Sequence, residues 1–245
     1  FHLLAGAHPT IYHRIKICRW GGVEFGKSLI AGCPNMVSMI TRELVETALA
    51  SRESAERFAR RMAAEAASQE VRLSEADLGA LAKLAGRYVR ETIRLLESCA
   101  TAGAQARADD VMKPVVSVAE GFFLKPPYAA EEPRGLFGVI CASYACRAAL
   151  KSMSERTRSL RGFPLLANDP HGEAAMIRRV IGSSVAARLE SEVEARLSDP
   201  RLRSATVGLH RLVGSLRASG GASDWGVPLE DEMTRFGAQT GFAVA

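Results

Sequence analysis

The sequence lacks any long apolar run that could cross a membrane. Its most apolar stretch, from Gly135 to Leu150, is too short for a membrane-spanning helix and carries Arg147. No segment has the charged and then apolar order of a secretory signal. We therefore expect a soluble protein without a transmembrane segment.

A disulfide framework is also missing. The cysteines are odd in number and scattered along the chain: Cys18, Cys33, Cys99, Cys141 and Cys146. The spacing of the last two fits neither a redox pair nor a zinc site, so we interpret the cysteines as small buried side chains. We expect a reducing compartment, either the cytoplasm or the matrix side of the mitochondrion. The start at Phe1 is compatible with an organellar protein that has lost a presequence.

The chain has no strong excess of charge of one sign. Its net charge is +5, and arginine greatly outnumbers lysine. A dedicated nucleic-acid-binding protein usually carries a denser basic surface. The composition therefore permits nucleic acid as a partner without favouring it.

What the sequence does contain is the pattern of amphipathic helices. From residue 35 to Met62, apolar residues recur at alternating three- and four-residue steps, with Val37, Ile40 and Leu44 as the first of them. This predicts one long helix that begins after Pro34. Ser74 and Asp77 have the spacing of a helix cap and predict a second helix to Cys99. Together they suggest an antiparallel pair.

Four further helices are expected along the chain. They are a short helix over 109–120, a buried central helix over 136–153, one from Asn168 to Leu197, and one from Asp199 to about residue 220. The proline-rich segment 121–133 predicts a connecting loop. The fold class is therefore all-α, with a single bundle of about six helices over residues 35–220. An irregular N-terminal arm (1–34) and an extended C-terminal tail (221–245) flank the bundle.

Residues 21–28 match the phosphate-loop pattern G-x-x-x-x-G-K-[ST]. In that pattern, glycines turn backbone N–H groups toward phosphates, a lysine reaches the phosphates, and a hydroxyl binds magnesium. The residues with these roles would be Gly21, Gly26, Lys27 and Ser28. The run before them is too charged for a buried parallel strand, and no alternation of strands and helices follows. Nucleotide binding is therefore an alternative function, and the main prediction contains no cofactor.

The role of Lys27 can be tested directly. If residues 21–28 bind a nucleotide, Lys27→Ala should abolish magnesium-dependent binding, because the lysine is the cation that reaches the phosphates. Titration of the purified protein with a nucleoside triphosphate, with and without magnesium, measures this. An unchanged affinity in the variant would remove the nucleotide-binding hypothesis.

Arg203 and His210 form a second candidate site. Their spacing places both side chains near one face of a helix. The pair resembles the loose motif of the HEPN helical ribonucleases, in which arginine and histidine act on an RNA phosphate. The resemblance implies an RNA-binding or RNA-cleaving helical protein, which is the other alternative function.

No catalytic residue and no metal ligand is assigned from the sequence. His2, His8 and His13 lie close together, but no acidic residue near them completes a metal site. No arrangement typical of nucleophilic catalysis is recognisable.

Large aromatic residues occur in both terminal segments, although we expect neither segment to form a core of its own that could bury them. They are Tyr12, Trp20 and Phe25 in the N-terminal arm and Trp225, Phe236 and Phe242 in the tail. Irregular segments gain order by lying on a neighbour, since alone they lose entropy without burying much surface. We therefore expect a non-catalytic structural or adaptor subunit of a larger assembly, with other protein subunits as its partners.

Overall fold

The computed structural model describes residues 36–105, 109–125, 135–161, 171–200, 202 and 230–242. All of these lie in one compact unit, residues 35–245, whereas residues 1–34 form a separate unit. The described part is helical, with no strand, which confirms the predicted all-α fold. Its helices are α1 (Met36–Ala50), α2 (Arg52–Ser68), α3 (Glu75–Gln105), α4 (Asp109–Leu124), α5 (Leu136–Arg161), α6 (His171–Ile181), α7 (Ser183–Leu197) and α9 (Glu230–Thr240).

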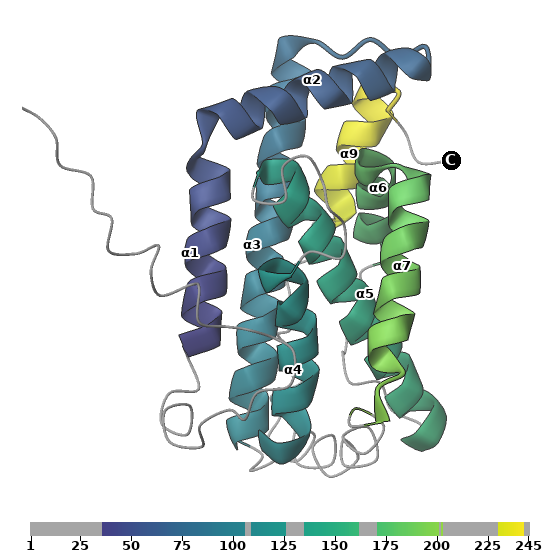
Figure 1. Cartoon of the computed structure of the whole chain (residues 1–245). Coiled ribbons are helices and arrows are strands. Elements are labelled where there is room, and N and C mark those ends of the chain that lie inside the picture. The colour runs from purple at the N-terminus through teal and green to yellow at the C-terminus, as the bar shows by residue number, and fades with distance from the viewer. Residues whose placement is uncertain are drawn as a thin grey trace, which may run out of the picture. The chain divides into compact units, whose positions relative to one another are not determined.

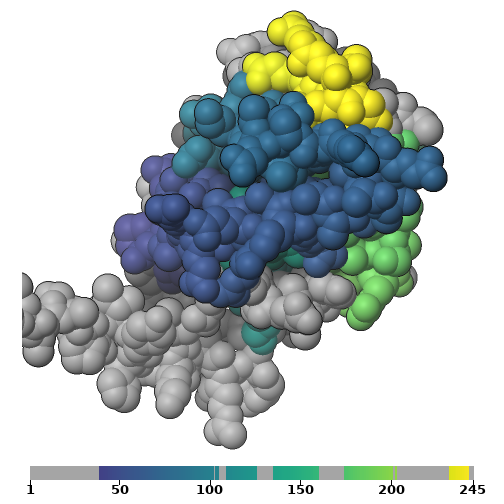
Figure 2. Space-filling view, turned by 90° about the horizontal axis from the view of Figure 1, so that it is seen from above, coloured from purple at the N-terminus to yellow at the C-terminus, as the bar shows by residue number. Residues whose placement is uncertain are grey.

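The centre of the bundle is α5, as its sequence predicts. Every residue from Leu136 to Cys146 is buried, and the helix packs against α2, α3, α4, α6 and α7. Figure 1 shows α1, α3, α4, α5 and α7 running side by side, with α2 lying across one end. Figure 2, which looks onto that end, shows α2 covering it. A helix that is apolar all round needs such neighbours on every side.

The predicted single helix from residue 35 to Met62 is wrong, because the chain turns at Ser51. The backbone of Ser51 is extended (ψ 108°), and its side chain accepts a hydrogen bond from the Ser54 backbone N–H at 3.2 Å. A serine side chain often accepts such a hydrogen bond from the first turn of a helix. A new helix, α2, therefore begins after Ser51 and runs in a different direction. The hydroxyl of Ser54 in turn accepts a hydrogen bond from the backbone N–H of Leu136.

The break also changes which face of α1 is buried. The predicted inward residues Ile40 and Leu44 are exposed and half-buried, and the structure buries Thr41 and Val45 in their place. Ala48, the next residue of the predicted face, is buried as expected. A shift of one residue turns the buried face by about 100°. The sequence pattern ran across Ser51 and therefore averaged the faces of two helices that point in different directions.

The predicted cap at Ser74 and Asp77 is present. The Ser74 backbone N–H donates to the Asp77 carboxylate at 2.9 Å, and the Asp77 backbone N–H donates to the Ser74 hydroxyl at 3.2 Å. These hydrogen bonds satisfy backbone groups that a helix leaves unpaired at its start. The Ser74 hydroxyl also donates to the Asp77 carboxylate at 2.6 Å, and this bond first, then the one from the Ser74 backbone N–H, holds the pKa of Asp77 below its usual value.

Two ion pairs show that α1 and α3 are antiparallel, as predicted. Arg42 pairs with Glu97, and Glu46 pairs with Arg90 at 3.0 Å. Because the residue numbers rise along α1 while those of the partners fall along α3, the two helices run in opposite directions.

The helix predicted from Asn168 to Leu197 is interrupted at Gly182. This glycine has φ +85°, in the left-handed region that side chains disfavour, and it separates α6 from α7. The apolar pattern continues on both sides of the break, so periodicity alone did not reveal it.

The tail is not extended throughout, because residues 230–240 form α9. Met233 and Phe236 lie one turn apart and are both buried, and Glu232 forms an ion pair with Arg87 of α3. α9 packs against α6 and α3. The glycines of the tail disfavour a helix and led to the prediction of an extended chain. Burial of these two apolar side chains stabilises the helix against that tendency.

None of the helices in the described ranges is long and apolar enough to cross a membrane.

Candidate functional site

Most residues that the sequence singles out lie outside the described part of the chain. This holds for the phosphate-loop residues Gly21, Gly26, Lys27 and Ser28, for the pair Arg203 and His210, and for the aromatic residues Tyr12, Trp20, Phe25 and Trp225. These assignments stay predictions.

Phe236 and Phe242 are the two predicted partner contacts that the structure does describe. Phe236 is 7% exposed and Phe242 is fully buried. The turn after α9 places Phe242: Gly241 has φ +68°, and the Phe242 backbone N–H donates to the Thr240 hydroxyl at 3.2 Å. Both rings therefore pack inside this chain.

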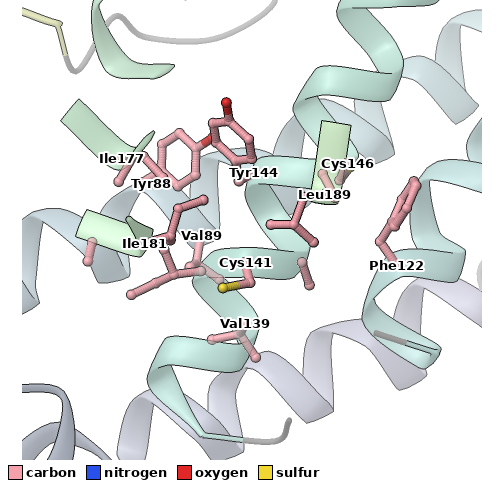
Figure 3. Close-up of a cluster of buried hydrophobic side chains, with 14 of the residues drawn as sticks. Tyr88, Val89, Phe122, Val139, Cys141, Tyr144, Cys146, Ile177, Ile181 and Leu189 are labelled. Carbon is pink, nitrogen blue, oxygen red and sulfur yellow. The ribbon is translucent and has the colours of Figure 1, made fainter. Parts of the chain in front are cut away.

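The core between the helices is formed by aliphatic, aromatic and cysteine side chains. Figure 3 shows Tyr88 and Val89 from α3, Phe122 from α4, Val139, Cys141, Tyr144 and Cys146 from α5, Ile177 and Ile181 from α6, and Leu189 from α7. The described cysteines are Cys99, Cys141 and Cys146, and all three are buried and free, in line with the expectation from their spacing. Burial raises the pKa of the Cys99 thiol to about 12. Such thiols stay protonated at neutral pH and are poor nucleophiles.

Glu120 of α4 lies in this apolar environment and is 4% exposed. It makes no hydrogen bond or ion pair with any other described residue. Burial, and after it the negative charge of Glu97 on α3, raises the pKa of the Glu120 carboxyl from 4.5 to about 7. Ionisable groups with strongly shifted pKa values are concentrated at functional sites. Glu120 is therefore the first candidate functional residue.

Cys146 of α5 lies near this carboxyl, and Cys99 of α3 lies near Cys146. Burial raises the pKa of the Cys146 thiol well above its usual value, and the nearby Cys99 and Glu120 side chains raise it further, while the positive charge of Arg147 lowers it. Glu120 thus lies where α3, α4 and α5 meet, and Glu97 places a second negative charge near it.

A separate polar contact joins α5 to α3. The Arg147 guanidinium donates from Nε to the Thr92 hydroxyl at 2.8 Å and lies over the Tyr88 ring, 4.3 Å from its centre. The Thr92 hydroxyl donates to the Tyr88 carbonyl oxygen at 2.9 Å. Arg147 therefore combines a cation–π contact with a partly buried hydrogen bond, and both join α5 to α3.

A second polar contact joins α5, α6 and α7. The Tyr144 hydroxyl donates to the Glu190 carboxylate, and Arg178 forms an ion pair with the same carboxylate. Burial first, and then the Glu190 carboxylate, raises the pKa of Tyr144 to about 12. Because the phenol stays protonated at neutral pH, this contact holds the helices together rather than supplying a base.

The surface of α1 carries an apolar edge, which consists of Met39, Ile40 and Leu44. Met39 is 62% exposed and Ile40 is 47% exposed, while Leu44, one turn further on, is half-buried. Among the side chains whose exposure the structure describes, the only other exposed large apolar one is Leu124, at the end of α4. Neighbouring exposed apolar side chains are typical of surfaces that bind other molecules.

Glu120 was missed at the sequence level although a signal exists. It follows Val116 by four residues and precedes Phe123 by three, so helical spacing places it on the apolar face of α4. The predicted helix stopped at Glu120, which hid this relation, since Phe123 then belonged to a loop.

The described residues include no group of three or more histidine, cysteine, aspartate or glutamate side chains that could hold a metal ion. Comparison of the chain with protein-family models, curated proteins and solved structures found no match.

Proposed function

We propose that this chain is a non-catalytic helical subunit or adaptor that binds other proteins within a larger assembly. The observation that carries the proposal is the apolar edge of α1. Met39 and Ile40 expose 62% and 47% of their surface, whereas the described large apolar side chains are otherwise buried or half-buried, apart from Leu124. A protein partner that covers this edge would remove the exposed apolar surface from water.

The position of α1 supports this role. Its ion pairs with α3, Arg42–Glu97 and Glu46–Arg90, fix the helix at two points along its length. The apolar edge is therefore presented on a rigid element. A partner that docks on it loses less conformational entropy than one that must order a loop.

The exposed apolar area of Met39 and Ile40 determines how much the edge contributes to the free energy of binding. Full burial of a methionine or isoleucine side chain stabilises by about 1.5–3 kcal/mol. Since Met39 and Ile40 are about half exposed, the two together contribute on the order of 2–3 kcal/mol to binding. This corresponds to roughly a 30- to 150-fold change in the dissociation constant.

The test compares the wild-type protein with the double variant Met39→Ser/Ile40→Ser. Purified from its native source, the wild-type protein should carry another protein at a fixed ratio. The double variant should lose that partner or bind it at least 10-fold more weakly, because serine removes the apolar contact. Co-purification ratios and a binding titration with the isolated partner measure the effect.

A matched control is available on the same helix. Thr47→Ser/Ala50→Ser changes two exposed positions of α1 to the same residue and should leave binding unchanged. Circular dichroism of both double variants checks that α1 still folds. A monomer without any partner, or a partner bound equally well by Met39→Ser/Ile40→Ser, would contradict the proposal.

We also propose a reducing compartment, the cytoplasm or the matrix side of the mitochondrion. The free, buried state of Cys99, Cys141 and Cys146 supports it, since these thiols are not used for disulfides. The nucleotide-binding and RNA-binding alternatives rest on residues 21–28 and on Arg203 with His210, and the Lys27→Ala experiment tests the first of them.

A further inference from the structure

Glu120 differs from most of the other buried polar side chains of the described ranges, among which only the Thr41 hydroxyl also lacks a hydrogen-bond partner. Thr92, Ser143 and Thr157 are also buried, but each hydroxyl donates to a carbonyl oxygen one turn earlier in its own helix. Among the residues whose burial the structure describes, Glu120 is the only buried acidic or basic one, and its carboxyl has no such hydrogen bond. An ionised carboxylate without a partner is costly in an apolar environment, whereas the protonated form costs much less.

The helix that carries Glu120 is attached differently from its neighbours. Ion pairs between described residues join α1 to α3, α3 to α9, α5 to α7 and α6 to α7. None of them joins α4 to another helix, since its Lys113–Asp109 pair lies within α4. The docking of α4 onto α3 and α5 therefore depends mainly on apolar burial, with Met112, Phe122 and Phe123 as its largest buried side chains.

α4 is also weakened from within. Pro114 lies inside the helix and has no N–H to donate to the carbonyl oxygen one turn earlier. Its far end is held by Arg196 of α7, whose guanidinium lies 4.2 Å from the centre of the Phe122 ring and donates to the Lys125 carbonyl oxygen at 3.1 Å. A helix with an interrupted hydrogen-bond ladder opens locally more readily than its neighbours.

The charged and titratable groups around Glu120 do not offset its negative charge. From α3 they are Glu97 and Cys99, from α5 Cys146 and Arg147, from α1 Arg42, and from α7 Arg196. Arg42 pairs with Glu97, Arg147 bonds to Thr92, and Arg196 stacks on Phe122. The three arginines are thus engaged by other groups, and Glu97 repels the carboxylate.

We propose that α4 is a proton-dependent element: it docks tightly onto α3 and α5 when Glu120 carries a proton, and it opens more often when the carboxylate is ionised. The pKa of Glu120, raised to about 7, places this change near neutral pH. Opening lets the carboxylate reach water, which restores its hydration. It also exposes the apolar face that includes Met112 and Phe123. The proposal does not depend on the function proposed above.

Amide hydrogen exchange on the full chain tests the proposal. After correction for the intrinsic pH dependence of exchange, protection of the α4 amides should fall about 10-fold between pH 6 and pH 8. This follows if the carboxyl titrates near 4.5 in the open form and near 7 in the docked form. Protection of α7, which carries ion pairs to α5 and α6, should change much less.

Three variants identify the group responsible. Glu120→Gln keeps the size of the side chain and should remove the pH dependence of α4 protection, whereas Asp110→Asn, an exposed change on the same helix, should keep it. Glu97→Gln should move the midpoint to lower pH, because one repelling charge is gone. This third variant serves if Glu120→Gln does not fold. Unchanged protection of α4 in the wild-type protein, an equal loss in α7, or the same pH dependence in Glu120→Gln would overturn the proposal.

Discussion

Replacing Glu120 with glutamine is expected to stabilise the protein at pH 8 by up to about 3 kcal/mol. The folded protein raises the pKa of this carboxyl from 4.5 to about 7. A tenfold change in proton affinity is worth about 1.4 kcal/mol. Above pH 7 the wild-type protein folds with a buried negative charge, which glutamine lacks.

The direction of the pH dependence follows from proton binding. Between pH 4.5 and 7 the folded protein holds a proton on Glu120 that the unfolded chain has released, so stability falls as the pH rises through this range. Above about pH 7 both states are ionised, and the loss is complete. Glu120→Gln removes this contribution and leaves that of every other group in place.

Urea denaturation of both proteins at pH 5, 6, 7 and 8 measures the difference. The free energies of unfolding should diverge with rising pH and reach their largest separation above pH 7. Glu46 and Asp77, whose pKa values are lowered by their hydrogen-bond partners, contribute equally to both proteins and cancel. Asp110→Asn should follow the wild-type curve. Parallel curves for wild type and Glu120→Gln would show that Glu120 does not titrate in this range.

Phe242→Ala is expected to destabilise the protein by about 3–5 kcal/mol, the range for removal of a fully buried phenylalanine. The ring is completely buried just after α9. Its loss removes apolar contacts and leaves a cavity that the turn at Gly241 can only partly close. Thermal and urea denaturation measure the effect.

Gln239→Ala is the matched control for Phe242→Ala. Gln239 is exposed on α9, so this variant should change the free energy of unfolding by less than about 0.5 kcal/mol. A similarly small effect of Phe242→Ala, combined with a loss of partner binding, would mean that Phe242 serves a partner and not the core of this chain.

The sequence was sufficient to predict the fold class and most of the helices, because their apolar spacing and caps are local properties. The cap at Ser74 and Asp77 and the buried central helix are examples. The breaks at Ser51 and Gly182 were not predicted, since apolar residues continue at helical spacing across both. The direction that each helix takes after such a break depends on tertiary contacts, such as the Arg42–Glu97 pair.

The candidate residues were harder to predict. The apolar edge of α1 results from the rotation of its buried face, which only packing against α3 determines. The burial of Glu120 depends on α3 and α5, and a helical pattern alone does not distinguish a lone acid at the end of a helix from one inside an interface. In α9, by contrast, the spacing of Met233 and Phe236 was present in the sequence, but the surrounding glycines outweighed it.

The contact between Ser54 and Leu136 has a consequence for how the chain assembles. The two residues are 82 positions apart, and the Ser54 hydroxyl satisfies a backbone N–H that α5 leaves unpaired at its start. The first turn of the central helix is thus completed by a side chain from the N-terminal third of the domain. Contacts between residues so far apart raise the contact order of the fold, which goes with slower folding than in a bundle built from local hairpins. The start of the central helix is therefore fully hydrogen-bonded only when the helix across the end of the bundle is in place.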